Sequence, residues 1–227
     1  MSQTETHHPM SVMFTAKDVA KSLAFYRDQL GFKVEASWPD EKKPMWANVL
    51  LDGQSIMFGA AMPPEAMNGE ACGHMDPATK QVMIERAKDY TKHKPGVGMM
   101  VYVQVKDVDQ YHGTLAKKGL KPTPPISQFY GIRDFCVADP DGYLLVFYSP
   151  IKLESCQSCG MPMKDAKPGK MYCEYCSDDH DQLKPYAQIF EGTVTGYFMG
   201  MMKMDRKSAE KAATEHLAKM PAWMGRK

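Results

Sequence analysis

The sequence predicts an α+β protein in which paired βαβββ modules form a curved mixed sheet with a cleft, followed by a small C-terminal module with helices. Three observations favour this fold: an internal repeat, turn signals between short apolar runs, and two close cysteine pairs near the C-terminus. The 227 residues are enough for one large domain or two smaller ones. We place the first at residues 9–149 and the second at residues 154–225.

The repeat is visible when FTAKDVAKSLAFYRDQLGFKVE is set beside VQVKDVDQYHGTLAKKGLKPTP. Each segment has an apolar strand, a Lys-Asp-Val step, a helical stretch and then a glycine before a second strand. Asp18 and Asp107 are predicted helix N-caps, because a carboxylate accepts hydrogen bonds from the first helical turn. Gly31 and Gly119 are predicted helix ends, because glycine adopts positive φ at little cost. The repeat therefore predicts two copies of one unit.

Further strand-like runs follow each predicted helix. In the first half they span 45–51 and 54–59, joined by the hairpin signal Asp52-Gly53. In the second half they span 121–127, 131–137 and 143–148, with the turn signal Asp139-Pro140-Asp141-Gly142 before the last run. Each half therefore has the order βαβββ.

The segment between the halves, residues 60–96, is too long for an ordinary connection. Its first part is rich in turn residues, and residues 78–90 have helical character. Long ordered insertions often serve as lids over binding sites. A lid and a plain surface excursion are both consistent with this segment.

Composition disfavours several classes of partner. The formal net charge is +1, so we expect no nucleic-acid partner. No run of about 18 apolar residues occurs, so we expect no membrane partner. The N-terminal segment MSQTETHHPM lacks the apolar stretch of a signal peptide, and a cytoplasmic location is the expectation.

Four of the six cysteines form two C-x-x-C pairs separated by thirteen residues. Thiolates suit zinc, which takes four tetrahedral ligands, and a set of four leaves no open position for substrate or water. An iron–sulfur centre and a dithiol redox pair are the alternatives. We predict one structural Zn²⁺ per chain, held by Cys156, Cys159, Cys173 and Cys176.

The cysteine module carries few apolar residues close to the predicted metal. We therefore expect metal binding, on the order of 10 kcal/mol, to supply much of its folding energy. The segments CQSCGMPM and YCEYC and the tail MPAWM resemble the zinc-ribbon domain found at the ends of many bacterial proteins. This resemblance implies zinc binding without a settled activity, and ribbons in general bind nucleic acid or protein.

The first 150 residues resemble the vicinal oxygen chelate superfamily, which has the glyoxalase and bleomycin-resistance fold. The resemblance is carried by AKDVAKSLAFYRDQLGF, the repeated VKDV and YGIRDFCVADPDGYLLVFY. Metal-dependent members of this superfamily hold a divalent ion in the cleft with His, Gln or Glu from four strands. The matching positions here are Ser11, Met57, Met100 and Val146.

None of these four side chains is a normal ligand for zinc, nickel, manganese or iron, which need carboxylate or imidazole donors. The resemblance therefore implies a cleft without a metal ion. Histidines occur elsewhere, with His7 and His8 in the N-terminal tail and His74 in the insertion. A site built from them is an alternative with no spacing signal behind it.

Strand alternation places mainly apolar and aromatic side chains on the cleft surface. The predicted cleft residues are Met13, Trp46, Asn48, Met57, Met100, Tyr102, Gln104, Arg133, Val146 and Tyr148. Such a surface suits a planar or amphipathic organic molecule, bound by burial and stacking. The alternative is that these residues pack the sheet, and that Arg133 pairs with a neighbouring aspartate.

The preferred hypothesis is a protein that binds a small organic molecule in a metal-free cleft, with a structural zinc ribbon. The first alternative is an enzyme, a metal-dependent lyase, isomerase or dioxygenase of the same superfamily. The second is a ligand-sensing regulatory protein that acts through the ribbon. Because many relatives with this fold dimerise, the resemblance also implies a homodimer.

Overall fold

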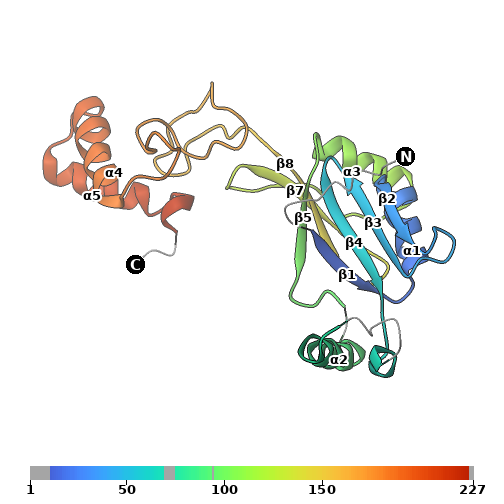
Figure 1. The fold of residues 1–227 in the computed structure, drawn as a ribbon. Coiled ribbons are helices and arrows are strands. Elements are labelled where there is room, and N and C mark those ends of the chain that lie inside the picture. The colour runs from blue at the N-terminus through green and yellow to red at the C-terminus, as the bar shows by residue number, and fades with distance from the viewer. Residues whose placement is uncertain (1–10, 69–74, 94, 225–227) are drawn as a thin grey trace. The chain divides into compact units, whose positions relative to one another are not determined.

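The structure, a computed structural model, describes residues 11–68, 75–93 and 95–224. The chain divides into two compact units (Figure 1). The first comprises Met1–Pro124 and Phe135–Tyr148, and the second comprises Pro125–Asp134 and Ser149–Lys227. Residue 9, the predicted start of the first domain, and residue 225, the predicted end of the second, lie outside the described residues.

The strands form two four-stranded mixed sheets with the same connectivity. The first sheet has the order β1-β4-β3-β2, with strands Val12–Ala16, Gln54–Ala60, Trp46–Leu51 and Lys33–Trp38. The second has the order β5-β8-β7-β6, with strands Met100–Gln104, Leu144–Pro150, Ile132–Ala138 and Ile126–Ser127. β1 pairs with β4, and β5 with β8, in parallel. The shared order confirms the predicted α+β fold with paired βαβββ modules.

A capped helix follows the first strand of each module. These helices are α1 at Val19–Ala24, continued by the π-helical η1 at Phe25–Leu30, and α3 at Val108–Lys117. The carboxylates of Asp18 and Asp107 accept amide hydrogen bonds from the first helical turn, at 3.0 and 2.9 Å. Gly31 and Gly119 have φ values of 82° and 86°. Both predicted caps and both predicted glycine stops are confirmed.

One apolar core serves both modules. It lies between the helices and one face of each sheet, and its largest fully buried rings are Tyr26, Phe14, Phe58, Phe135 and Phe147. Alternate residues of each strand point away from this core, because successive side chains of a strand project to opposite faces. We call the side of each sheet opposite the core its open face.

The turn before β8 joins the second module to the first. Asp139 Oδ1 accepts amide hydrogen bonds from residues 141–143, and its Oδ2 accepts one from the Tyr26 hydroxyl at 3.2 Å. The Tyr143 ring stacks on Phe14 with 4.1 Å between the ring centroids. Burial raises the pKa of Asp139. The turn is therefore part of the core and not a loose connection.

The predicted strand at residues 121–127 is mostly absent, and only Ile126–Ser127 pairs with β7. The reason is chemical, because Pro122, Pro124 and Pro125 have no amide hydrogen to donate to a sheet. Before β6, the Thr123 amide donates a backbone hydrogen bond to the Cys136 carbonyl at 3.0 Å. The prolines therefore shorten this edge of the second sheet.

The insertion between the modules contains two helices, the 3₁₀ turn η2 at Pro64–Asn68 and α2 at Pro77–Lys92. Asp76 caps α2 by accepting from the amides of residues 78 and 79. α2 buries Ala87 against a small apolar cluster of Met62, Met75, Met83 and Ile84. Figure 1 shows α2 outside both sheets, and the hydroxyl of its Tyr90 contacts the Thr15 carbonyl of β1. Residues 69–74, which include His74, and the N-terminal His7 and His8 lie outside the described residues.

The second unit ends in a helical hairpin. Its elements are α4 at Tyr186–Gly192, η4 at Thr193–Met201, α5 at Arg206–Leu217 and the 3₁₀ turn η5 at Pro221–Trp223. The expectation of little apolar mass near the cysteines is wrong, because three of the cysteines share a buried cluster with Met163, Ile189, Leu217 and Trp223. None of the described helices is long and apolar enough to cross a membrane.

Candidate metal centre and ligand-binding face

Two turns of the second unit bring four cysteine sulfurs together. The sulfur atoms lie within 4.8 Å of one another and belong to Cys156, Cys159, Cys173 and Cys176. Those of Cys159 and Cys173 are 3.7 Å apart. A tetrahedral zinc ion with Zn–S bonds of about 2.3 Å places its sulfurs about 3.8 Å apart. The four side chains therefore fit an ion of this size and geometry.

Each cysteine pair lies in a tight turn closed by its own backbone. The Gly160 amide bonds the Cys156 carbonyl at 2.8 Å, and Gly160 has φ 76°. The Cys176 amide bonds the Cys173 carbonyl at 2.9 Å. Across the cluster, the Cys173 amide donates to the Cys156 sulfur at 3.3 Å. A hydrogen bond of this kind favours the thiolate, which is the form that binds metal.

Crowding makes the four thiols ionise unequally. A hydrogen bond between Cys159 and Cys156 holds the pKa of Cys156 well below its usual range and raises the pKa of Cys159. Four thiolates at this spacing repel one another unless a cation lies between them. The cluster is therefore suited to a divalent cation.

The first turn also holds a buried hydroxyl. Ser158 is 0% exposed, and its Oγ makes no hydrogen bond of ordinary geometry within the described residues. The Cys156 thiol raises the pKa of Cys176, and the Ser158 hydroxyl acts in the opposite direction. Ser158 is therefore placed to donate to an ionised Cys176 sulfur. No sequence pattern indicates this role, since serine is common in such turns.

The C-terminal tail packs on the same turn. The Trp223 indole donates to the Ser158 carbonyl at 3.0 Å, and the His216 Nε2 lies 2.8 Å from the Cys159 carbonyl. The Ala222 amide bonds the Gln157 carbonyl at 3.0 Å. These contacts hold the turn that carries the first two sulfurs.

Register places four predicted cleft residues side by side on the open face of the first sheet. Met57 pairs with Met13 on one side and with Asn48 on the other. Trp46 pairs with Gly59, and the Met13 side chain lies over the space that a side chain at Gly59 would fill. Met13 is 49% exposed. This part of the face is therefore apolar and accessible.

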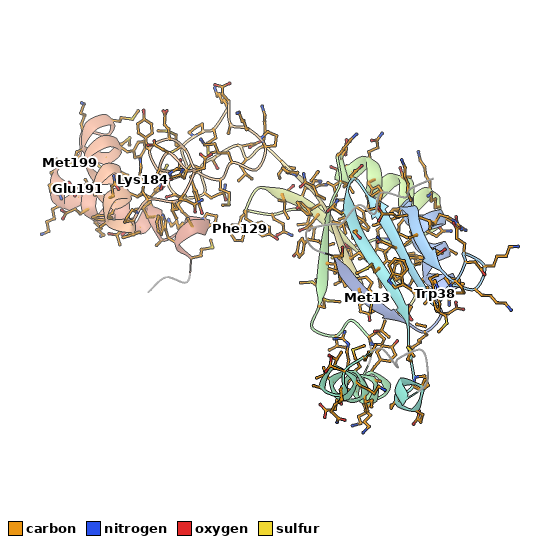
Figure 2. The ribbon with its side chains drawn as sticks, viewed as in Figure 1. Met13, Trp38, Phe129, Lys184, Glu191 and Met199 are labelled. Carbon is orange, nitrogen blue, oxygen red and sulfur yellow. The ribbon has the colours of Figure 1, made fainter. Side chains whose placement is uncertain are left out.

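Polar groups and a further ring border this surface. The Asn48 amide, only 8% exposed, donates to Glu35 Oε2 at 2.5 Å and accepts from the Ser55 hydroxyl at 2.8 Å. Glu35 lies where the pairing of β2 with β3 shifts register. Trp38, paired with Trp46, is 59% exposed (Figure 2). Glu35 is not among the predicted cleft residues, because a register shift is invisible in the strand pattern.

The open face of the second sheet brings together the predicted aromatic residues. The rings of Tyr102 and Tyr148 meet edge to face at 6.1 Å, and the Tyr148 hydroxyl lies 3.4 Å from Gln104 Oε1. Tyr102 and Met100 are 47% and 56% exposed. Val146 pairs with Tyr102 but is only 2% exposed, so it packs beneath the exposed side chains and is not part of the accessible surface.

Comparison with protein families gives two matches. The Glyoxalase/Bleomycin resistance protein/Dioxygenase superfamily matches residues 8–147, more than half of the chain. This chain belongs to that superfamily. The family described as "Putative zinc ribbon domain" matches residues 155–224. Comparison with curated proteins gave no match.

Solved structures of the glyoxalase/bleomycin resistance superfamily are similar at low identity. A member from Sphaerobacter thermophilus DSM 20745 is 21% identical, with 63% of this chain and 96% of that chain covered and a TM-score of 0.42. TnmS3, an antibiotic binding protein from Streptomyces sp. CB03234, is 19% identical, with 64% of this chain and 97% of that chain covered and a TM-score of 0.41. A lactoylglutathione lyase from Agrobacterium tumefaciens is 14% identical, with 62% of this chain and 92% of that chain covered and a TM-score of 0.44.

The four positions at which metal-dependent superfamily members carry metal ligands differ here in burial and in place on the fold. Met57 and Met100 are on the open faces, Val146 is buried, and exposed Ser11 precedes β1. Within residues 11–68, 75–93 and 95–224, the four cysteines are the one group of three or more His, Cys, Asp or Glu side chains that could hold a metal ion.

Arg133 differs from the other predicted cleft residues. It lies in the second unit, and its Nη1 donates to the Ser127 hydroxyl at 3.1 Å. Along β7 it alternates in phase with Phe135 and Val137, which belong to the core. Its part in ligand binding stays a prediction.

Proposed function

We propose that this superfamily member binds a small planar or amphipathic organic molecule on its open sheet faces, without a metal ion there, and that Zn²⁺ in the ribbon is structural. The observation that carries the proposal is the identity of the side chains at the four superfamily ligand positions, Ser11, Met57, Met100 and Val146. Without carboxylate or imidazole donors at these positions, recognition falls to apolar burial and stacking.

The exposure of large side chains supports this proposal. Met13, Met100 and Tyr102 are each about half exposed although they lie on regular strands. Met100 and Tyr102 lie two residues apart on β5, and exposed large apolar side chains that cluster on one face often mark a binding site. Gln104, which is exposed beside Tyr148, supplies a polar group that orients a ligand.

Ligand binding can be tested with the full chain and a panel of planar aromatic compounds, including antibiotics. We expect at least one compound to raise the melting temperature, and Tyr102→Ala to abolish that rise. Tyr175→Ala is the matched control, because Tyr175 is also exposed but lies beside the cysteine cluster. The proposal fails if no compound stabilises the protein, or if both variants lose the effect equally.

The proposal for the ribbon rests on the donor set. Four thiolates fill a tetrahedral zinc ion and leave no position for a substrate or an activated water. Elemental analysis should find one zinc per chain, and Cys173→Ser should lose it. A second metal ion that persists in Cys173→Ser would support a metal-dependent lyase, isomerase or dioxygenase instead.

A further inference from the structure

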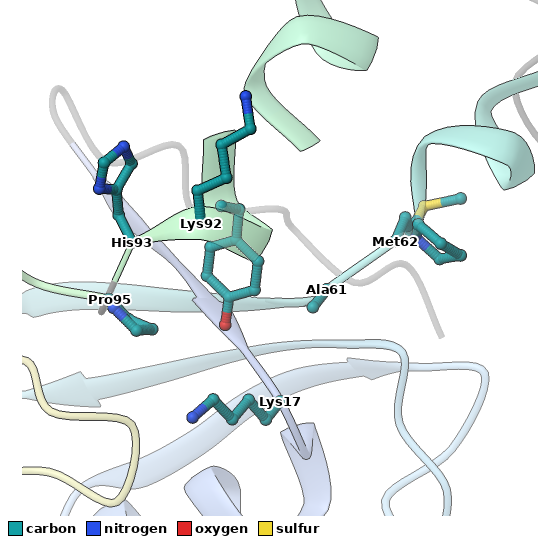
Figure 3. A pocket seen from close by; sticks show the side chains of 8 residues that line it. Lys17, Ala61, Met62, Lys92, His93 and Pro95 are labelled. Carbon is teal, nitrogen blue, oxygen red and sulfur yellow. The ribbon is translucent and has the colours of Figure 1, made fainter. Parts of the chain in front are cut away.

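A cavity of about 550 Å³ lies in the first unit, where the insertion returns to the first sheet (Figure 3). Lys17, just after β1, and Met62, shortly after β4, line it from the sheet. Lys92 and His93, at the end of α2, line it from the insertion. None of the predicted cleft residues lines this cavity.

The charged lining of the cavity is cationic. Lys17 and Lys92 contribute two ammonium groups, and the His93 imidazole adds a third nitrogen-bearing side chain. Figure 3 shows His93 and Pro95 on one side of the cavity and Met62 on the other. An anion that enters this space would therefore meet several donors and positive charges.

Neighbouring carboxylates reduce this positive charge, but they hold neither lysine ammonium group in a tight ion pair. Both oxygens of Asp141 are already engaged, one by the Lys17 amide at 3.0 Å and the other by the Ser22 hydroxyl at 2.8 Å. Asp89 lies 3.8 Å from the Lys92 ammonium, but both side chains are about two-thirds exposed. An exposed pair of this kind contributes only ~0–1 kcal/mol, so Lys92 can exchange it for a ligand. The Lys17 ammonium has no ion pair within the described residues.

The rest of the lining is apolar or neutral. It consists of Ala61, Met62, Pro63, Pro95 and the ring of Tyr90. The Tyr90 hydroxyl donates to the Thr15 carbonyl at 3.3 Å, and burial raises its pKa to about 12. Tyr90 therefore stays neutral and adds no negative charge to the cavity. The volume falls in the range of roughly 300–1,000 Å³ that small-molecule sites occupy.

We propose that this cavity binds a small organic anion, whose carboxylate or phosphate group contacts Lys17, Lys92 and His93 and whose compact apolar body packs on Met62 and the two prolines. The insertion then forms one wall of a binding site. Because the cavity shares no residue with the predicted cleft, this site stands apart from the function proposed above.

The internal repeat offers a matched pair of variants. Lys17 and Lys106 each precede the N-cap aspartate of the first helix of their module, and both are exposed, but only Lys17 lines the cavity. The full chain, labelled at its methionine methyl groups with carbon-13, can be titrated with benzoate, phenyl phosphate and the neutral benzyl alcohol. The Met62 signal is assigned with Met62→Leu.

We expect both anions, and not benzyl alcohol, to shift the Met62 signal in a saturable way that weakens as salt is raised. Lys17→Gln should weaken anion binding about fivefold, the upper end for one partly exposed ion pair, and Lys106→Gln should leave it unchanged. If phenyl phosphate binds more tightly than benzoate, the anionic group that the cavity prefers is a phosphate ester. The reverse order identifies a carboxylate as the preferred group.

Three results would overturn the proposal: an unmoved Met62 signal at saturating anion, equal binding of benzyl alcohol, or equal effects of Lys17→Gln and Lys106→Gln. If Lys17→Gln lowers the melting temperature, Lys92→Gln takes its place, because Lys92 lies at the exposed end of α2. The same weakening is expected of Lys92→Gln, and unchanged binding by that variant would also overturn the proposal.

Discussion

The Ser158 hydroxyl is buried without an ordinary hydrogen bond among the described residues, a rare situation for a buried polar atom. A thiolate at Cys176 gives it an acceptor, so metal binding would relieve the unpaired donor. Removing such an outer hydrogen bond typically weakens metal binding by about 10–100-fold. We therefore expect Ser158→Ala to bind zinc at least about tenfold more weakly, as measured by competition with a chromophoric chelator.

Ser177 offers the control for this prediction. It is also buried beside the cluster, but its hydroxyl donates to the Cys173 carbonyl at 3.1 Å and not to a sulfur. Ser177→Ala should therefore change zinc affinity much less than Ser158→Ala. Equal losses in the two variants would mean that general loosening of the ribbon, and not the Ser158 donor, sets the affinity.

A second prediction at the residue scale concerns Asp139 and the pH dependence of the unfolding free energy. Its pKa is raised by burial in the folded chain, so the folded state holds the proton more tightly than the unfolded state does. The stability that this gives is present below the unfolded pKa and is lost as pH rises through the folded pKa. Asparagine does not titrate, so Asp139→Asn should gain stability relative to the wild type as pH rises from about 3.5 to 7.

Urea unfolding across this pH range measures the difference. Asp139→Asn keeps an oxygen for the amides of residues 141–143, whereas Asp139→Ala leaves them without an acceptor and should cost about 2–4 kcal/mol at every pH. A difference between wild type and Asp139→Asn that does not change with pH would contradict the argument.

At the scale of elements, the C-terminal tail and the first cysteine turn act as one piece. The Trp223 indole bond to the Ser158 carbonyl is the polar part of this contact, and the buried ring is the apolar part. We expect Trp223→Phe to lower the unfolding free energy of the second unit by about 1–2 kcal/mol, because a buried carbonyl loses its donor. Trp223→Ala should cost about 3–5 kcal/mol, because it also leaves a cavity.

These values can be measured by urea unfolding with circular dichroism. Tyr175→Phe, which changes an exposed ring beside the second cysteine pair, should leave stability within about 0.5 kcal/mol. An equal stability of Trp223→Phe and wild type would show that the tail does not hold the turn.

Elements that depend on local chemistry could be predicted from the sequence. Asp52 and Gly53 have φ values of 48° and 81°, as the hairpin signal requires. Local chemistry also explains α5, because Asp205 caps it by accepting from the Ser208 amide, and Ala209 and Ala213, both 0% exposed, recur at the helical spacing of one buried face. The strand predicted at 121–127 is wrong over most of its length, because three of its seven residues are prolines, which have no amide hydrogen to donate to a sheet.

The two sites differ in the same way, because only the one that depends on local sequence could be predicted. The four cysteines lie in two short motifs, so their spacing alone predicts that the sulfurs meet. The Glu35–Asn48 contact depends on a register shift between two strands, and the cationic cavity depends on how the insertion returns to the sheet. Neither arrangement leaves a pattern in the sequence, because each depends on how separate elements pair or pack against one another.

At the scale of the whole molecule, the two units have separate apolar clusters. The first unit's core is made of strand and helix residues and includes none of the four paired cysteines, whereas the second unit's cluster includes Cys156, Cys173 and Cys176. The homodimer implied by the superfamily resemblance stays a prediction. Separate clusters mean that the loss of metal should affect one unit and spare the other.

The chain has three tryptophans, which report the two units separately. Trp38 and Trp46 lie on β2 and β3 of the first unit, and Trp223 is buried in the second. A Trp38→Phe, Trp46→Phe double variant therefore reports only the second unit, and Trp223→Phe reports only the first. Treatment with a zinc chelator under reducing conditions should lower the unfolding midpoint seen by Trp223 and leave the midpoint seen by Trp38 and Trp46 unchanged.

The size of the drop separates two sources of ribbon stability. If metal binding supplied nearly all of it, the chelated unit would unfold without denaturant, as small zinc modules do. Because Ile189, Leu217 and Trp223 bury an apolar cluster against the cysteines, we expect the helical hairpin to keep part of its structure, with residual helical circular dichroism and a broadened transition. Equal shifts in both tryptophan signals would contradict the separation, because they would show that the first unit also depends on the metal.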